Sequence, residues 1–330
     1  MKVCHYFVMD SVKMGGGIAT SAKQQRKALD RNNVEWTSDP SEDYDILHLN
    51  TFSPFSLYHL FKAKMKGKKT VFHAHTTVKD FKGSFKFSNI LAPVYRKITT
   101  KVYNSVDKLI APSKYAEEIV RDQGVDNDIV VLTNGFDDEK LEGTSEMREQ
   151  AREKYDLEGF TVVNLAGVFE RKGLDDFIAV AKELEDVEFI WMGKIPSLAP
   201  RETKNKIEAS PENVTFTGFV DDPREAFAVG DVFFFPSKEE TQGIAILESA
   251  YCGLPLVVRD LPAYEHWLED GVNCLKSDNV EGFIESIEKL RQDEGLKNDI
   301  SNGAKKESER HTLEQVGSRL EEIYRELTVS

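Results

Sequence analysis

Short hydrophobic runs recur along the chain, and segments with the spacing of amphipathic helices separate them. In the first half these runs, rich in β-branched and aromatic residues, occupy residues 2–9, 44–49, 70–75, 108–113 and 129–134. After a charged stretch the alternation resumes with runs at 160–167, 187–193, 214–219, 231–237 and 254–260. Because nearly continuous hydrophobic strands between helices are typical of parallel sheets covered on both faces, the pattern predicts two doubly wound α/β domains.

The charged stretch in the middle of the chain predicts a domain boundary. We expect an N-terminal domain over residues 1–140, a linker over 141–158 and a C-terminal domain over 159–310. The last segment, 311–330, carries one hydrophobic stripe at helical spacing, formed by Leu313, Val316, Leu320, Ile323, Tyr324 and Leu327. It is predicted to form a helix that packs back on the domains.

Composition narrows the class of protein. The chain has 330 residues, enough for two hydrophobic cores, and its net charge of −14 disfavours nucleic acid as a partner. Its three cysteines are far apart and form no C-x-x-C pair, which argues against a disulfide framework and a zinc ribbon. No hydrophobic run reaches the roughly 18 residues that span a bilayer. We expect a folded protein in the cytoplasm or on the inner face of the cell membrane.

Positive charge gathers in one part of this acidic chain. Between Leu60 and Ile110 twelve Lys or Arg residues face only Asp80 and Asp107. These cations can be ordinary solvated side chains, or, with the aromatic residues among them, they can bind an anionic membrane surface. On the second interpretation the membrane or acceptor contacts are Lys79, Lys82, Phe85, Lys86, Arg96 and Lys97.

Two glutamates eight residues apart suggest a binding site in the C-terminal domain. Glu240 lies in the loop after the run at 231–237, and Glu248 lies in a helix predicted to start near Gly243. Ionised carboxylates accept hydrogen bonds from sugar hydroxyls, whereas the first N–H groups of a helix, here at Gly243 and Ile244, favour an anion. Such a site would suit a sugar phosphate, unless both acids are simply solvated.

A glycine-rich turn and a histidine pair are further candidates in the N-terminal domain. Gly16 and Gly17 precede a predicted helix, where backbone amides can meet a phosphate or a sugar, although the turn can also be merely flexible. The third glycine of a dinucleotide fingerprint is missing, because Thr20 takes its place. His73 and His75 point to the same side of a predicted strand, but no third ligand is evident, so we assign no metal and no cofactor.

The run from Pro236 to Pro255 resembles the E-x7-E signature of the retaining glycosyltransferases of family four, which have the GT-B fold. VLTNGFD at 131–137 and GVFERKGLDDFIAVAK at 167–182 are similar to two further segments of that family. The resemblance covers essentially the whole chain and implies two Rossmann-like domains that face each other across a cleft. In its motif residues and its length, the chain looks most like the branch that glycosylates glucosyl-diacylglycerol.

The resemblance implies roles for these residues in a nucleotide-sugar transferase. Glu248 would bind the ribose hydroxyls and Glu240 the hydroxyls of the transferred sugar, while Arg171 and Lys172 would hold the diphosphate. The family usually has arginine directly after the first glycine of the phosphate segment, where this chain has Val168, so we expect Arg171 to take that role. The implied substrate is a nucleotide-diphosphate sugar, most simply a UDP-hexose.

The resemblance implies further contacts for residues whose side-chain chemistry gives less support to a role. His73 would orient a hydroxyl of the donor sugar, although it can also be a buried core histidine. Asn134 can touch the donor or form a local turn. Backbone contacts with the nucleobase are implied for Gly193, Gly218, Phe219 and Val220.

We therefore expect a retaining, metal-independent hexosyltransferase that acts on a membrane glycolipid or diacylglycerol-type acceptor. Three alternatives stay open. The acceptor can instead be a polysaccharide or polyprenyl-linked glycan, the protein can bind a nucleotide sugar without catalysis, or it can be a dehydrogenase, which the incomplete glycine fingerprint disfavours.

Overall fold

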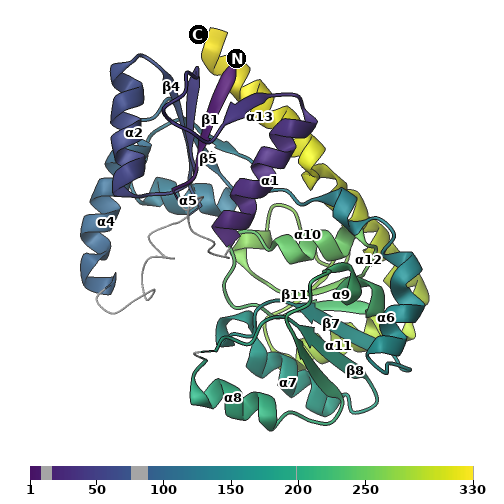
Figure 1. The fold of residues 1–330 in the computed structure, drawn as a ribbon. Coiled ribbons are helices and arrows are strands. Elements are labelled where there is room, and N and C mark those ends of the chain that lie inside the picture. The colour runs from purple at the N-terminus through teal and green to yellow at the C-terminus, as the bar shows by residue number, and fades with distance from the viewer. Residues whose placement is uncertain (9–16, 76–87, 198, 330) are drawn as a thin grey trace. The chain divides into compact units, whose positions relative to one another are not determined.

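The computed structural model describes residues 1–8, 17–75, 88–197 and 199–329. The chain divides into two compact units, one formed by Met1–Phe136 with His311–Ser330 and the other by Asp137–Arg310. Each unit holds one six-stranded parallel sheet with helices on its faces (Figure 1), which confirms the predicted fold class.

In the first unit the strand order is β2-β1-β3-β4-β5-β6. The strands are β1 (Lys2–Tyr6), β2 (Glu35–Thr37), β3 (Ile46–Leu49), β4 (Lys69–His73), β5 (Lys108–Ala111) and β6 (Ile129–Val131). The helices are α1 (Gly17–Arg31), α2 (Pro54–Met65), α4 (Ser88–Tyr103), α5 (Lys114–Asp122) and α13 (Leu313–Val329). Because all neighbours are parallel, the carboxyl ends of these strands share one edge of the sheet.

Alternate strand residues face two separate cores in this unit. Leu47 and Leu109 pack against α2, α4 and α5, whereas Ile46 and Ile110 pack against α1 and α13. Gly317 lets α13 approach α1 closely, since a Cβ at this position would lie 2.3 Å from a backbone oxygen of α1. The predicted stripe of the last helix is buried along its whole length, as expected from its spacing.

In the second unit the strand order is β12-β11-β10-β7-β8-β9. The strands are β7 (Thr161–Leu165), β8 (Glu188–Met192), β9 (Val214–Gly218), β10 (Val232–Phe235), β11 (Leu256–Arg259) and β12 (Leu275–Ser277). The helices are α6 (Arg148–Lys154), α7 (Leu174–Glu183), α8 (Arg201–Glu208), α9 (Arg224–Val229), α10 (Ile244–Tyr251), α11 (Val280–Gln292) and α12 (Glu294–Ser308). Short 3-10 turns occupy Asp138–Leu141, Ser145–Met147, Glu170–Lys172, Pro262–Tyr264 and Glu309–His311.

An aromatic core fills one face of the second sheet. Phe177 of α7 contacts Trp191 and Phe234 at ring-centroid distances of 5.0 and 5.8 Å, and Phe283 of α11 contacts Phe234 at 5.0 Å. Phe233 points to the other face, toward Phe227 of α9. These contacts fix the sheet that positions the carboxyl-end loops described below.

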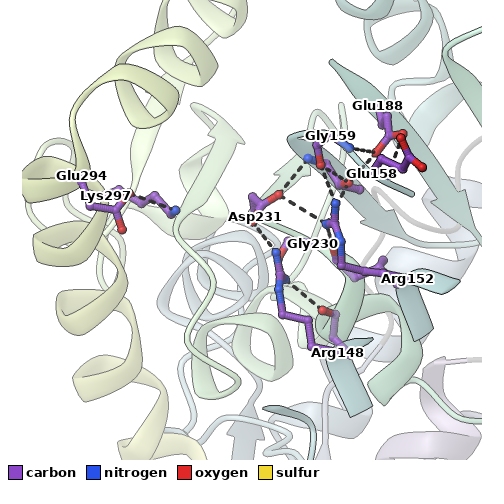
Figure 2. Close-up of polar contacts among 12 residues, drawn as sticks. Arg148, Arg152, Glu158, Gly159, Glu188, Gly230, Asp231, Glu294 and Lys297 are labelled. Carbon is purple, nitrogen blue, oxygen red and sulfur yellow. Dashed lines mark hydrogen bonds and ion pairs between the residues drawn. The ribbon is translucent and has the colours of Figure 1, made fainter. Parts of the chain in front are cut away.

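The segment expected to link the domains, residues 141–158, lies within the second unit and holds α6. Figure 2 shows how α6 is attached to the amino ends of the strands: Arg148 donates to the Gly230 oxygen at 2.8 Å and to Asp231 at 2.6 Å. Arg152 donates to the oxygens of Gly159 and Val229 at 2.6 and 2.9 Å. These arginines tie the start of the unit to its sheet, at the edge opposite the carboxyl ends.

Candidate functional site

Two loops at the carboxyl edge of the second sheet bring Lys172 and Glu240 into contact. Lys172 follows β7 and Glu240 follows β10, and the ammonium of the lysine forms an ion pair with Glu240 Oε1. The same carboxylate oxygen accepts a hydrogen bond from Ser237 Oγ at 2.7 Å. Both charged side chains are mostly buried, with exposures of 16% and 10%. Two residues that are 68 positions apart in sequence therefore form one charged centre.

A glycine makes this approach of the two loops possible. Gly173 has φ +83°, and a Cβ there would lie 2.3 Å from the Pro236 oxygen, so only glycine fits. Backbone bonds then join the loops: the Lys238 N–H donates to the Arg171 oxygen at 2.7 Å. The arrangement is held by the main chain and does not depend on the ion pair alone.

Arg171 has a different environment from Lys172. It is exposed, its guanidinium lies 5.8 Å from the ring centroid of Phe169, and it forms no ion pair with any residue that the structure describes. An arginine with its charge free beside the Lys172–Glu240 pair can bind a further anion.

Glu248 is the second glutamate of the spaced pair. It lies in α10, and its carboxylate forms no hydrogen bond within the described parts of the chain. Burial raises the pKa of Glu248 to about 7, although the nearby charge of Lys140 opposes the shift. A carboxyl group whose charged form lacks partners can gain them from ligand hydroxyls.

Gly243 sets the start of α10. It adopts φ +83° as the residue before the helix, which begins at Ile244 as the sequence predicted. The ring of Tyr264 lies beside it, 3.6 Å from the position of a Cβ at Gly243. The first N–H groups of α10 are thus placed in the same carboxyl-end region as the loop of Glu240.

The expected nucleobase segment follows β8 and β9 at the same edge. The Gly193 N–H donates to the Gly218 oxygen at 2.8 Å, and a Cβ at Gly193 would lie 1.8 Å from the Ala166 oxygen. The glycine is therefore required by close backbone packing, whether or not a base binds. Phe219 is 70% exposed, and Val220 next to it is partly exposed.

At the carboxyl edge of the first sheet lies a cluster of neutral polar side chains. His73 is 1% exposed and stacks on His75 at a ring distance of 4.1 Å and on His48 at 5.8 Å. Burial lowers the pKa of both His48 and His73 well below 6.5, and it lowers the pKa of His75 to about 3. The rings carry no charge near neutral pH.

A chain of hydrogen bonds fixes which nitrogen of His73 carries its proton. Arg26, which can only donate, binds His5 Nδ1 at 3.1 Å, so His5 is protonated at Nε2 and donates to Gln25 Oε1 at 2.8 Å. The Asn50 amide lies 3.0 Å from the same His5 Nε2, and this assignment therefore turns the amide oxygen of Asn50 toward His5. The Gln25 amide nitrogen then donates to His73 Nδ1 at 3.0 Å. His73 therefore holds its proton on Nε2, a buried atom with no hydrogen-bond partner in the described chain. The Nε2–H group of His73 therefore either donates to a ligand or stays unsatisfied.

The structure also places the other predicted residues. Asn134 is buried just after β6, and Gly17 is the first residue of α1. Arg96 donates to the backbone oxygens of Asp122 and Gln123 at the end of α5, so its head group holds helices together. Lys97 is exposed on α4. Outside the described residues lie Gly16, Lys79, Lys82, Phe85 and Lys86.

Within the described ranges, no three histidine, cysteine or acidic side chains are arranged to hold a metal ion. None of the helices there is both long enough and apolar enough to cross a bilayer. His73 and His75, considered above as a metal pair, instead bind the amide groups of Gln25 and Asn50.

Sequence reasoning missed several residues of these two edges. Ser237 has no pattern of its own, and Gln25 lies 48 positions before His73, so only the fold reveals their contacts. Tyr264 is fully buried, and its hydroxyl has no partner among the described atoms. Burial, aided by the charge of Glu240, raises the pKa of Tyr264 well above 10. The one signal available for Ser237 was its position directly after Pro236, in the run that resembles the E-x7-E signature.

Comparison with known proteins finds two family models that match this chain. Residues 27–140 match the model of Glycosyltransferase Family 4, and residues 159–293 match that of Glycosyl transferases group 1. The processive diacylglycerol alpha-glucosyltransferase of Acholeplasma laidlawii is 34% identical over 99% of this chain and 98% of its own. The alpha-galactosylglucosyldiacylglycerol synthase of Streptococcus pneumoniae is 28% identical over 82% of this chain and 75% of its own.

A solved structure shares the fold at low sequence identity. Anabaena Alr3699/HepE, crystallised with UDP and glucose, superimposes with a TM-score of 0.79 at 17% identity, covering 98% of this chain and 99% of its own. That likeness establishes the GT-B fold. The family matches and the full-length relative together show that this chain belongs to the family 4 glycosyltransferases.

Proposed function

We propose that the protein transfers a hexosyl group from a UDP-hexose to a hydroxyl of a diacylglycerol-type glycolipid, with retention of anomeric configuration. The observation that carries this proposal is the 34% identity, over nearly the full length of both chains, with an enzyme named processive diacylglycerol alpha-glucosyltransferase. The nucleotide is inferred from HepE, whose structure contains UDP.

The diphosphate of the donor binds at the carboxyl edge of the second sheet in this proposal. Arg171 supplies an unpaired charge, and Lys172 exchanges part of its contact with Glu240 for a phosphate oxygen. The first N–H groups of α10, at Gly243 and Ile244, add neutral donors. Charge that develops on the leaving phosphate is thus met by cations and dipoles that are already in place.

The sugar and the ribose bind through carboxylates. Glu240, oriented by Ser237 and Lys172, accepts hydrogen bonds from hydroxyls of the hexose. Glu248 accepts them from the ribose, which satisfies a carboxylate that otherwise lacks partners. Backbone groups at Gly193 and from Gly218 to Val220, with Phe219 between them, contact the base.

Polar groups of the first unit serve the sugar as neutral donors. His73 donates from Nε2 to a hydroxyl of the hexose, which gives its unsatisfied proton a partner. Asn134 and the backbone of Gly16 and Gly17 provide further contacts with the donor. None of these contacts requires a group to change its charge.

In the transfer step the bond from the anomeric carbon to the diphosphate oxygen breaks, and a bond to the acceptor oxygen forms on the same face. The acceptor proton passes to the leaving phosphate oxygen, so no protein nucleophile is needed. We place the enzyme on the cytoplasmic face of the cell membrane, where an acidic chain can meet a lipid acceptor through its basic segment, which includes Lys79, Lys82, Phe85, Lys86, Arg96 and Lys97.

Nucleotide release tests the proposal. The protein is incubated with UDP-glucose, UDP-galactose, UDP-N-acetylglucosamine and GDP-mannose, each with vesicles containing diacylglycerol or glucosyl-diacylglycerol. We expect release with one UDP-hexose, stimulated by the lipid acceptor, and a glycolipid product whose new linkage has the donor's anomeric configuration. Release stimulated only by a polyprenyl-linked glycan would assign the alternative acceptor. Tight UDP-hexose binding without turnover in any mixture would contradict catalysis.

A further inference from the structure

Tyr264 is a fully buried tyrosine whose hydroxyl has no partner in the described structure. It ends the turn Pro262–Tyr264, which follows β11 at the carboxyl edge of the second sheet. Its ring is perpendicular to that of Trp267, with centroids 5.8 Å apart, and it lies beside Gly243 at the start of α10. A phenylalanine would make the same ring contacts. Because a buried hydroxyl without a hydrogen bond costs stability, the hydroxyl needs a partner that this arrangement does not provide.

Glu240, in the loop before α10, can accept one more hydrogen bond. Its two donors among the described residues, Ser237 Oγ and the Lys172 ammonium, both bind Oε1. The other oxygen, Oε2, forms no hydrogen bond with any residue that the structure describes. A carboxylate offers about four lone-pair positions on its two oxygens, so a further donor can be accommodated.

Tyr264 and Glu240 lie in the same part of this edge. β10 and β11 are parallel neighbours, so the loop of Glu240 and the turn of Tyr264 follow adjacent strand ends. Glu240 also stands three positions before Gly243, the glycine beside which the tyrosine ring lies. The charge of Glu240 acts on the tyrosine hydroxyl and, together with burial, keeps its pKa well above 10. The hydroxyl is therefore a neutral O–H donor near a carboxylate with a free oxygen.

Binding of a diphosphate would change what Glu240 requires. In the proposed function the Lys172 ammonium gives part of its contact with Glu240 to a phosphate oxygen. Glu240 is only 10% exposed, and a carboxylate in such a place is costly when it loses its cation. A neutral donor from the protein itself would compensate for part of that loss without adding a charge.

We propose that Tyr264 is a positioning residue: when a donor diphosphate draws Lys172 away, the Tyr264 hydroxyl donates to Glu240 and holds its carboxylate toward the hexose. The inference rests on the proposed function and assigns a role within the same site. Glu240 is favoured over the sugar itself as the partner, because protein atoms cover the tyrosine oxygen. The exchange requires a rotation of the Glu240 side chain, and it breaks no covalent bond and transfers no proton.

Tyr264→Phe tests the proposal, since it removes only the hydroxyl oxygen. In the full chain it should lower kcat/KM about tenfold for nucleotide release from the UDP-hexose that the parent uses fastest, the effect of one hydrogen bond to a charged group. It should not lower the Tm of the protein without nucleotide, because the hydroxyl has no partner there to lose. A lower Tm with unchanged kcat/KM would make the hydroxyl a structural group and overturn the proposal.

Tyr155→Phe is the matched control in the same unit. The Tyr155 hydroxyl donates to Glu225 at 2.5 Å, at the end of α6, so this variant also removes a tyrosine hydroxyl that lies near a glutamate. Here the expected results are the opposite: the Tm should fall, and kcat/KM should stay that of the parent. A loss of kcat/KM in Tyr155→Phe equal to that in Tyr264→Phe would contradict a specific role for Tyr264.

Two further measurements show whether the hydroxyl acts through Glu240. In a Glu240→Gln background, Tyr264→Phe should change kcat/KM less than about twofold, since the carboxylate that the hydroxyl would bind is gone. UDP added to the parent should shift the tyrosine absorption band to longer wavelength, as donation to a carboxylate does, and Tyr264→Phe should lack this shift. The same loss in both backgrounds, or the same spectral change in both proteins, would overturn the proposal.

The inference can fail separately from the proposed reaction. If UDP shifts the absorption of Tyr264 but no sugar reaches a lipid, the role of the hydroxyl stands and the proposed transfer fails. If sugar is transferred and Tyr264→Phe behaves as the parent does, the transfer stands and the inference fails.

Discussion

The carboxyl edges of the two sheets share the same backbone architecture but carry different side chains. At the edge of the second sheet, charged side chains meet: Lys172 and Glu240 are paired, and Arg171 stays free among the described residues. At the edge of the first sheet, His73 and its neighbours are buried and neutral, and amide groups bind them. One parallel-sheet architecture thus provides a charged site in one unit and a neutral hydrogen-bonding site in the other.

The difference indicates a division of chemical roles. A departing diphosphate develops negative charge, and fixed cations can stabilise it. A sugar hydroxyl needs orientation, for which a neutral N–H donor suffices and a charged one would pay a large desolvation cost in such a buried place. The comparison therefore predicts that the two edges respond in different ways to pH and to loss of charge.

The largest expected effect is acid destabilisation of the first unit. The pKa values of His48 and His73 are lowered well below 6.5 by burial, so below pH 6.5 the unfolded chain takes up protons that the folded unit does not. Stability should fall as the pH drops from 7 to 5, by about 2 kcal/mol for each ring. Urea unfolding followed by Trp36 fluorescence measures this, in a chain whose Trp191 and Trp267 are replaced by phenylalanine.

A second reporter chain gives the control for that measurement. Trp191 is fully buried in the second unit, and retaining it alone reports on a core without these histidines. If the Trp36 signal showed the same unfolding free energy at pH 7 and pH 5, the rings would not be held neutral in the folded state.

The next effect in size concerns the charged edge. Lys172→Ala should reduce kcat for nucleotide release about 100-fold, since groups that stabilise developing charge usually contribute a few kcal/mol. Lys238→Ala is the matched control: it removes a lysine from the adjoining loop that pairs with Asp176 at 3.4 Å. Equal losses for the two variants would show that positive charge in general, and not the Lys172 position, matters.

The sequence was sufficient to predict most of the fold. All ten hydrophobic runs contain strands of the two sheets, because buried parallel strands need continuous apolar residues. The two strands that were not predicted, β2 and β12, have three residues each and lie at sheet edges. Glu35 and Lys276 within them show why: a charged residue interrupts each of these short strands, whereas the edge strands β6 and β9 lie in longer hydrophobic runs.

The candidate site was predictable only where its residues share a motif. Glu240, Glu248, Arg171 and Lys172 stand in segments with recognisable spacing. The chain from Arg26 to His73 does not, because it joins a helix to two strands through contacts that depend on the tertiary fold. Whether a buried histidine is a donor or an acceptor follows from such partners, which no local pattern encodes.

A smaller effect is expected from disturbing the neutral edge. Gln25→Leu keeps the side-chain size but removes the amide that fixes the His73 proton on Nε2, and kcat should fall about tenfold, comparable to the loss of one catalytic hydrogen bond. Gln25→Glu places a carboxylate beside the His73 ring and should raise the pKa of that ring, which adds to the pH profile of kcat a titration of His73 that the parent lacks. The measurement is the pH profile of kcat with the lipid acceptor.

The neighbouring glutamine provides the control. Gln24 lies next to Gln25 on α1 and is buried, but its Oε1 has no partner in the described structure. Gln24→Leu should leave both kcat and its pH profile unchanged. A loss equal to that of Gln25→Leu would indicate general damage to the helix, and Gln25 would have no role in positioning His73.

The smallest effect concerns Glu248, the group of the charged edge whose pKa lies close to 7. Its pKa is raised to about 7 by burial, so between pH 4.5 and 7 the folded protein binds more protons than the unfolded chain and loses stability as the pH rises. Glu248→Gln removes this loss. At pH 8 the variant should be more stable by about 1 kcal/mol, a small value because the group is partly exposed, with a rise in Tm of about 2–4 °C by calorimetry.

Nucleotide binding should lower the pKa of Glu248 again, because ribose hydroxyls that donate to the carboxylate favour its charged form. At pH 7 the parent should therefore release about half a proton when UDP binds. Calorimetric titrations in buffers of different ionisation enthalpy measure this number, and Glu248→Gln should bring it near zero while weakening binding. If the parent and the variant released the same number of protons, Glu248 would lie outside the nucleotide site, and the carboxylates of the charged edge would reduce to Glu240 alone.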